Sequence, residues 1–168
     1  IPTTWYNHIK YDNATGTYII NPEWLDYVKT TVDYAYELDM FVIINVHHET
    51  WVNVAKFDTA SYEKASRILT DIWTVVADTF ADYDQHLIFE TLNEPRLVGT
   101  AEEWTLEIDN VTDNVRNAIG IINNLNQIAA DAIWDNGSAY NKERMIMSPG
   151  YGATINGSRI NLFKLPAD

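Results

Sequence analysis

Short apolar runs alternate with long amphipathic segments along this chain, and this alternation constrains the fold more than any other feature. The apolar runs are short enough for buried strands, which we expect at residues 1–5, 41–46, 87–92 and 145–147. Between them, apolar side chains recur every three or four residues, which predicts helices at residues 22–38, 61–80 and 112–134. Strict alternation of strand and helix predicts an α/β fold with a parallel sheet.

The length of the chain limits how much of a closed fold it can build. A chain of 168 residues can bury a core and reads as one unit. A complete (β/α)8 barrel needs at least about 200 residues, so the pattern predicts a partial (β/α)8 TIM barrel, about half a barrel. An open doubly wound sheet is the alternative, although no glycine-rich turn follows the first strand to bind a phosphate.

The composition narrows the class of partner. The chain carries 11 basic and 24 acidic residues, a net charge of −13, which argues against nucleic acid and membrane partners. No cysteine is present, so disulfides and thiolate zinc sites are excluded. The 6 Trp and 10 Tyr side chains fill cores, but aromatic rings also line clefts that bind sugars. A neutral or polar substrate therefore fits this composition best.

The segment Thr-Leu-Asn-Glu-Pro at residues 91–95 is the strongest candidate for chemistry. It overlaps the end of the strand expected at residues 87–92, so Asn93 and Glu94 lie where a buried strand runs out into a loop. A carboxylate held there by a rigid strand can act as a proton donor or base in a cleft. Glu94 is accordingly the candidate general acid/base.

A second polar group, His47, His48 and Glu49, follows the strand expected at residues 41–46. Successive strand residues point to opposite faces, so adjacent histidines rarely chelate one ion, and no HExxH spacing is present. We therefore expect no metal. His47 and His48 are interpreted as cleft residues that hydrogen-bond substrate hydroxyls, with a structural role as the alternative for each.

A partner carboxylate for Glu94 is harder to find. Glu90 lies on the same strand, and four strand residues span roughly 13 Å. Two-carboxylate glycosidases hold their carboxyl groups about 5–5.5 Å apart when retaining and about 6.5–9.5 Å apart when inverting. Glu90 is therefore expected to be a structural acid, hydrogen-bonded inside the fold. Glu49 is a weaker candidate, and no Gly-x-Ser-x-Gly elbow offers a serine nucleophile.

Four segments at the expected strand ends form a recognisable set. The segments are Ile1-Pro2-Thr3-Thr4-Trp5, Asn45-Val46-His47-His48-Glu49-Thr50-Trp51, Leu87-Ile88-Phe89-Glu90-Thr91-Leu92-Asn93-Glu94-Pro95-Arg96 and Met145-Ile146-Met147-Ser148-Pro149-Gly150-Tyr151. Together they resemble glycoside hydrolase family 5, in its cellulase and endoglucanase branch. They match that family's second to fifth barrel strands in order and interval, and the resemblance covers essentially the whole chain. The resemblance implies a single partial catalytic domain over residues 1–168, without the N- and C-terminal barrel strands.

The resemblance also implies roles for individual residues. Glu94 matches the general acid/base, Asn93 the residue that holds the sugar 2-hydroxyl, and His47 a residue near the cleaved bond. Further candidates for substrate binding in the same motifs are His48, Trp51 and Tyr151. No cofactor is implied. The family's nucleophile, a glutamate on the seventh strand, lies beyond Asp168, so the isolated chain is expected to be inactive.

The activity implied is that of a retaining endo-β-1,4-glucanase, secreted from the cell, that acts on cellulose or another β-glucan polysaccharide or oligosaccharide. A mannanase or xyloglucanase on the same scaffold is one alternative, and a non-catalytic half barrel that binds glycans or only assembles is another. A half barrel leaves two open edge strands and an apolar sheet face. We therefore expect either further strands in the parent protein or a homodimer that closes a barrel from two halves.

Overall fold

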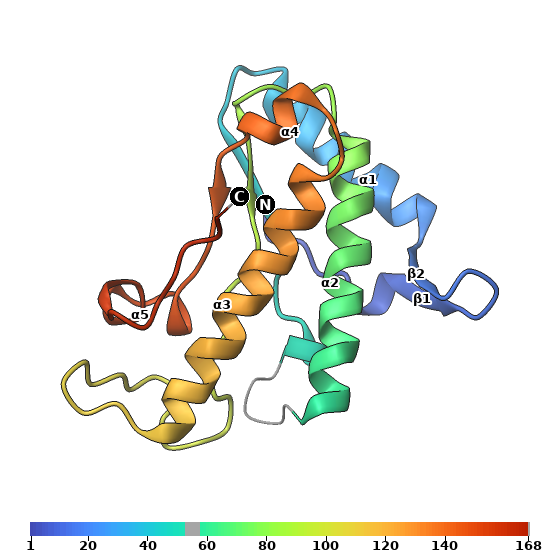
Figure 1. The fold of residues 1–168 in the computed structure, drawn as a ribbon. Helices are drawn as coiled ribbons and strands as arrows, with labels where there is room; N and C mark the ends of the chain where they lie inside the picture. Colours follow the sequence, from blue (N-terminus) through green and yellow to red (C-terminus); the bar gives the residue numbers. More distant parts are fainter. Residues whose placement is uncertain (53–57, 168) are drawn as a thin grey trace.

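The computed structural model describes residues 1–52 and 58–167 and shows helices α2 and α3 packed side by side against a small sheet (Figure 1). The helices and strands are β1 (Ile9–Asp12), β2 (Thr17–Ile20), α1 (Pro22–Tyr36), β3 (Val42–Asn45), α2 (Thr59–Thr79), β4 (Leu87–Glu90), α3 (Asp113–Trp134), α4 (Ala139–Glu143), β5 (Ile146–Met147) and α5 (Ile155–Arg159). Short 3-10 turns are η1 (Tyr6–His8), η2 (Thr50–Val52) and η4 (Tyr151–Ala153). The longest helices match the three that the sequence predicts.

The sheet contains β3, β4 and β5 in that order, and all of its pairs are parallel. Asn45 at the end of β3 pairs with Glu90 at the end of β4, which in turn pairs with Met147 of β5. The three strands therefore end at one edge, where loops can bring polar side chains together. Over the described residues the sheet is parallel, packs against helices and does not close on itself, so the predicted partial α/β fold with a parallel sheet is confirmed.

Each long helix begins at a side-chain cap. The amide oxygen of Asn21 accepts a hydrogen bond from the Glu23 N–H at 2.8 Å, and Pro22 occupies the first position of α1. Asp58 caps α2 and Thr112 caps α3 in the same way. These caps satisfy N–H groups that have no partner within the helix, which is why the helices start at these residues.

Most of the core lies between the sheet and helices α2 and α3. Ile44 and Phe89 project from the strands, and they pack in one cluster with Leu69 and Trp73 of α2 and Leu125 of α3, all at most 1% exposed. A second cluster lies beyond the carboxyl edge, around Leu97, Leu106, Ile119, Ile122, Tyr151 and Ile160. Burial of these side chains supplies most of the driving force that holds the helices on the sheet.

Residues 1–5, expected to be a strand, run beside β3 without forming a regular ladder. The Ile1 amino group donates to the Ile43 carbonyl at 2.6 Å, and the His47 N–H donates to the Thr3 carbonyl at 3.0 Å. Between these contacts, the Thr3 N–H donates to the side-chain oxygen of Asn45 instead of to a backbone carbonyl. The asparagine side chain thus interrupts the backbone pairing that a strand requires.

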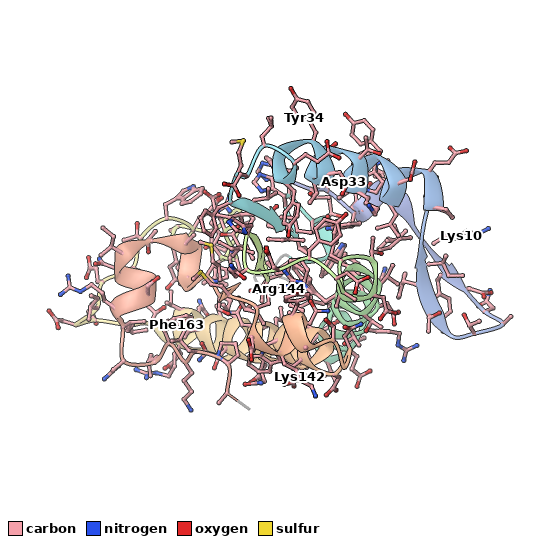
Figure 2. The ribbon with its side chains drawn as sticks, turned by 90° about the horizontal axis from the view of Figure 1, so that it is seen from above. Lys10, Asp33, Tyr34, Lys142, Arg144 and Phe163 are labelled. Atoms are coloured by element: carbon pink, nitrogen blue, oxygen red, sulfur yellow. The ribbon has the colours of Figure 1, made fainter. Side chains whose placement is uncertain are left out.

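The hairpin of β1 and β2 was not predicted from the sequence. It lies beside α2 on the side away from α3, with Lys10 marking it in Figure 2. Its turn closes through a Gly16 N–H bond to the Asp12 carbonyl, and Gly16 has a φ of 75°, which favours glycine. The Tyr18 N–H donates to Asp71 of α2 at 2.7 Å, so the hairpin is fixed to that helix.

Arg144, near the centre of Figure 2, holds the connection that leads from α2 into β4. Its buried guanidinium donates to the carbonyls of Leu87 at 2.7 Å, Tyr83 at 2.7 Å and Phe80 at 3.0 Å. The charge is thus compensated by carbonyl dipoles. This contact sets where β4 enters the sheet and so helps to place its carboxyl end.

No helix among the described residues has the length and apolar character needed to cross a bilayer.

Candidate active site

A pocket of about 430 Å³ opens at the carboxyl ends of β3 and β4. Two loops line it, one after each strand, so residues far apart in the sequence meet across it. The lining residues are Val46, His48, Glu49, Thr50, Val52, Leu92, Asn93, Glu94, Pro95, Arg96 and Val98. This is the edge at which the sequence places its polar motifs.

Glu94 lines this pocket with its side chain 38% exposed, and Asn93 lies next to it in the lining. The Glu94 carboxylate is 3.4 Å from the Arg96 guanidinium, which also donates to the Glu94 backbone carbonyl at 2.8 Å. The carboxylate is therefore held at its backbone yet open to a ligand. A carboxylate placed in this way is accessible for proton exchange with a ligand.

The backbone before Asn93 is fixed by a buried polar network. The Thr91 N–H donates to the Met147 carbonyl at 3.0 Å, and the Thr91 hydroxyl donates to Asn126 of α3 at 2.7 Å. Asn126 in turn donates to the Pro149 carbonyl at 3.0 Å. The ends of β4 and β5 are thus bound to one helix, and the loop that carries Glu94 leaves a rigid base.

His47 and His48 differ in position. His48 lines the pocket in the left-handed region, with a φ of 44°, whereas His47 lies behind it, their ring centroids 4.1 Å apart. Burial lowers the pKa of His47, His48 lowers it further, and the charge of Glu94 opposes the shift. The amide nitrogen of Asn45 donates to Nδ1 of His47 at 3.1 Å, so the neutral imidazole carries its proton on Nε2.

The expectation of no metal at His47 and His48 was based on strand alternation, which does not apply to these two residues in the structure. β3 ends at Asn45, so the two histidines follow the strand and strand alternation does not set their directions. Their rings stand edge to face. Within residues 1–52 and 58–167, no group of three or more His, Asp or Glu side chains is placed to hold a metal ion.

Glu90 accepts a hydrogen bond from the Asn45 amide at 2.8 Å, which is the internal role expected for it. Glu49 is also engaged internally. One of its oxygens accepts from the Trp5 N–H and the other from the Trp51 indole N–H. Burial raises the pKa of Glu49 to about 7, against the effect of these donors. Glu49 thus joins the segment before η1 to the turn η2 on one wall of the pocket.

Two residues expected to bind substrate, Trp51 and Tyr151, are not among the residues that line the pocket. The Trp51 indole N–H is used by Glu49, and its ring packs against the main core, outside the pocket lining. Tyr151 is 2% exposed in the second core cluster. Its hydroxyl donates to the Glu102 carbonyl at 2.7 Å and accepts from the Leu97 N–H at 3.2 Å. Tyr151 therefore supports the loop after β4, and the substrate contact expected for it stays a prediction.

Arg96 is a pocket residue that the sequence reading did not single out. It contacts Glu94 and Glu103, and its guanidinium lies 3.9 Å from the centroid of the Trp104 ring. The sequence does contain a signal for Arg96, because this residue directly follows Asn-Glu-Pro. Glu103 and Trp104 had none, because they lie in an irregular loop where no period links them to the motif.

A parallel α/β sheet with an acidic pocket at its carboxyl edge is the arrangement of TIM-barrel enzymes. The family model described as Cellulase (glycosyl hydrolase family 5) matches residues 1–168. The chain therefore belongs to glycoside hydrolase family 5.

Curated relatives agree with this assignment. Endoglucanase A of Clostridium longisporum is 40% identical over 172 residues, covering 100% of this chain and 30% of the relative. Endoglucanase B of Neocallimastix patriciarum is 41% identical over 167 residues, covering 99% of this chain and 32% of the relative. The chain thus spans about a third of the length of these relatives.

Solved structures agree with the fold. Two structures of a family 5 lichenase from Caldicellulosiruptor sp. F32 superpose on this chain with a TM-score of 0.87 at 38% identity. One of them is a mutant in complex with cellotetraose. The match covers 99% of this chain and 43% of the lichenase chain. A broad specificity endoglucanase from Ruminococcus champanellensis with bound cellotriose gives a TM-score of 0.84 at 34% identity, over 99% of this chain and 44% of the other.

Proposed function

We propose that this chain is the acid/base part of the catalytic domain of a retaining endo-β-1,4-glucanase that cleaves cellulose or a related β-glucan. The observation that carries the proposal is the half-exposed carboxylate of Glu94, next to Asn93 in the pocket at the carboxyl edge. Similarity to endoglucanases, and to structures with bound cellotetraose and cellotriose, supports a β-glucan as the substrate.

In the proposed mechanism, Glu94 donates a proton to the leaving glycosidic oxygen while a second carboxylate attacks the anomeric carbon. This step forms a covalent glycosyl-enzyme intermediate. Glu94 then removes a proton from water, which attacks the anomeric carbon and releases the sugar. Asn93 hydrogen-bonds the sugar 2-hydroxyl, a contact that strengthens in the transition state. His47, neutral with its proton on Nε2, supports the site behind His48.

The second carboxylate must come from outside the described pocket. Glu49 is the other carboxylate in the lining, and both of its oxygens are occupied by Trp5 and Trp51. We therefore propose that the isolated 168-residue chain binds sugar weakly and does not complete hydrolysis. Retaining turnover by the purified chain, verified by mass spectrometry to be intact, would refute this.

The test of the function uses the full-length gene product that contains this chain. Glu94→Gln keeps the shape of the side chain but removes its proton, and we expect kcat on a soluble β-glucan to fall about 10²–10⁴-fold. Glu37→Gln is the matched control, because Glu37 is exposed at the end of α1 and absent from the pocket lining. Unchanged turnover in Glu94→Gln would overturn the proposal.

The alternatives are separated by substrate and by binding. A mannanase or xyloglucanase would prefer mannan or xyloglucan in a panel assayed on the full-length protein. A non-catalytic glycan-binding module would show no hydrolysis with or without Glu94→Gln, whereas an enzyme loses hydrolysis and retains binding. We also propose that the protein acts outside the cell, because a polymeric glucan does not cross a membrane.

A further inference from the structure

Arg96 is held on three sides at the rim of the pocket. Its Nε donates to Glu103 at 3.1 Å, and its Nη1 donates to the Glu94 carbonyl at 2.8 Å. The same Nη1 lies 3.4 Å from the Glu94 carboxylate. The guanidinium also stacks on the Trp104 ring, 3.9 Å from its centroid. One cation thus faces two carboxylates and is kept in one plane.

Glu103 is fixed as firmly as the arginine that it contacts. Its second oxygen accepts from the Gly99 N–H at 2.8 Å. Gly99 has a φ of 81°, a backbone conformation that residues with a side chain rarely adopt. The Gly99 hydrogen bond, and after it the ion pair with Arg96, hold the pKa of Glu103 below its ordinary value. Glu103 is therefore a permanent negative charge at neutral pH.

The contact between Arg96 and Glu103 reduces an effect of Arg96 that would oppose the acid role of Glu94. A general acid must hold its proton at the working pH, but a neighbouring guanidinium favours the ionised carboxylate. The contact from Arg96 to Glu103 is shorter than the contact to the Glu94 carboxylate. Part of the arginine charge is therefore neutralised by a carboxylate that takes no part in the reaction.

We propose that Glu103 is a positioning residue for Glu94: it holds Arg96 and shares its charge, so that Glu94 can keep the proton it donates. Trp104 keeps the guanidinium plane in place. The inference rests on the proposed acid/base role of Glu94. It adds a specific function to a residue that lies nine positions after Glu94 in the sequence.

Other titratable groups also lie at or near this pocket and are unchanged by substitutions at position 103. His48 and Glu49 line the same pocket after β3, and His47 senses the charge of Glu94. These groups belong to the loop after β3, whereas Glu103 belongs to the loop after β4. Differences between variants at position 103 therefore report on the Arg96 contact.

The test compares Glu103→Gln with Glu102→Gln in the full-length enzyme. Both variants remove one negative charge, but the Glu102 carboxylate bonds to Thr112 and Asn114 instead of to Arg96. Without Glu103, Arg96 favours ionised Glu94, so we expect the alkaline limb of the pH profile of kcat/KM to move down by about 0.5–1 pH unit. Glu102→Gln should move it by less than about 0.2 unit, because surface charges at longer range are screened.

The dependence on Arg96 is tested by a double-mutant cycle. Arg96→Met should move the alkaline limb to higher pH, and adding Glu103→Gln to it should cause no further shift. An alkaline limb in Glu103→Gln that matches Glu102→Gln, or a full shift in the Arg96→Met background, would overturn the inference. If Glu103→Gln does not fold, Glu103→Asp keeps the charge but draws the carboxylate away from Arg96, so it should give a smaller shift in the same direction.

Failure of this inference is distinguishable from failure of the proposed function. If Glu94→Gln retains turnover, Glu94 is not the acid, and both ideas fall. If Glu94→Gln is inactive but Glu103→Gln leaves the alkaline limb in place, only the role of Glu103 is wrong.

Discussion

At the scale of single residues, the pocket separates two glutamates by the partners that each one has. Glu94 has one long contact to a cation and an open face, whereas Glu49 has an N–H donor on each oxygen and is half-buried. The first arrangement leaves a carboxylate free to exchange a proton with a ligand. The second arrangement fixes a carboxylate in the wall of the pocket, where its protonation state affects the free energy of unfolding.

Glu49 should make the stability of the fold depend on pH. Its pKa in the folded chain is about 7, above the ordinary value of 4.5, so the folded state binds more protons between these values. Its contribution to stability is therefore fully present below about pH 4.5 and is lost as the pH rises through about 7. Relative to Glu49→Gln, the wild-type chain should lose roughly 1–3 kcal/mol between pH 4.5 and 8, measured by urea unfolding. Parallel pH dependence in the two proteins would contradict this.

At the scale of elements, the ends of β4 and β5 are held by Asn126 of α3, which is fully buried. Asn126→Leu leaves the Thr91 hydroxyl and the Pro149 carbonyl without this partner. We expect a loss of about 2–4 kcal/mol in the free energy of unfolding, because buried polar groups lose their hydrogen bonds.

The control for this substitution lies on the same helix. Asn124 is exposed on α3, so Asn124→Leu should change stability by less than about 0.5 kcal/mol. Chemical denaturation of both variants measures the difference. Equal stability of the Asn126 and Asn124 variants would show that the buried network does not hold the strand ends.

The elements also show what can be predicted from the sequence. The long helices have strong periods and caps such as Asn21, so their positions follow from local rules. Residues 1–5 and the hairpin depend on contacts that no local pattern records, namely the Asn45 side chain and Asp71 of α2. In the first case a side chain overrides the local strand propensity. In the second case each strand has only four residues, which is too short to give a clear alternating pattern.

The candidate site divides in the same way. The Asn93-Glu94 pair was predictable because it directly follows a buried strand, whose carboxyl end faces the pocket. Tyr151 also lies near a strand end, but its hydroxyl finds the Leu97 and Glu102 backbone and the ring is buried. Sequence position gives the edge of the sheet on which a side chain lies. Its direction depends on packing partners that come from distant segments.

At the scale of the whole molecule, the outer edges of the sheet are incompletely paired and carry exposed apolar side chains. Residues 1–5 cover part of the β3 edge. β3 and β5 are the outer strands, and Ile43 and Met147 on them are 37% and 39% exposed. Phe41 and Met145, at the opposite ends of these strands, are more exposed still. Such edges and faces favour association with further chain.

The isolated 168-residue chain should therefore associate with itself, either as a homodimer that completes a barrel or as larger species. Sedimentation velocity at several concentrations should show a weight-average mass above that of the monomer that rises with concentration. The full-length protein, at the same concentrations, is the comparison. A stable monomer of the intact chain at all concentrations would contradict both the dimer and the need for further strands.

The central claim is that Glu94 supplies the proton to the leaving group, and leaving groups of different basicity test it most directly. In the full-length enzyme, kcat/KM of Glu94→Gln should fall at least about 10²-fold on a β-glucan, whose leaving oxygen needs protonation. On a dinitrophenyl β-cellobioside, whose leaving group departs without a proton, kcat/KM should stay within about tenfold of the wild-type value. Equal losses on the two substrates, or no loss on either, would contradict the account.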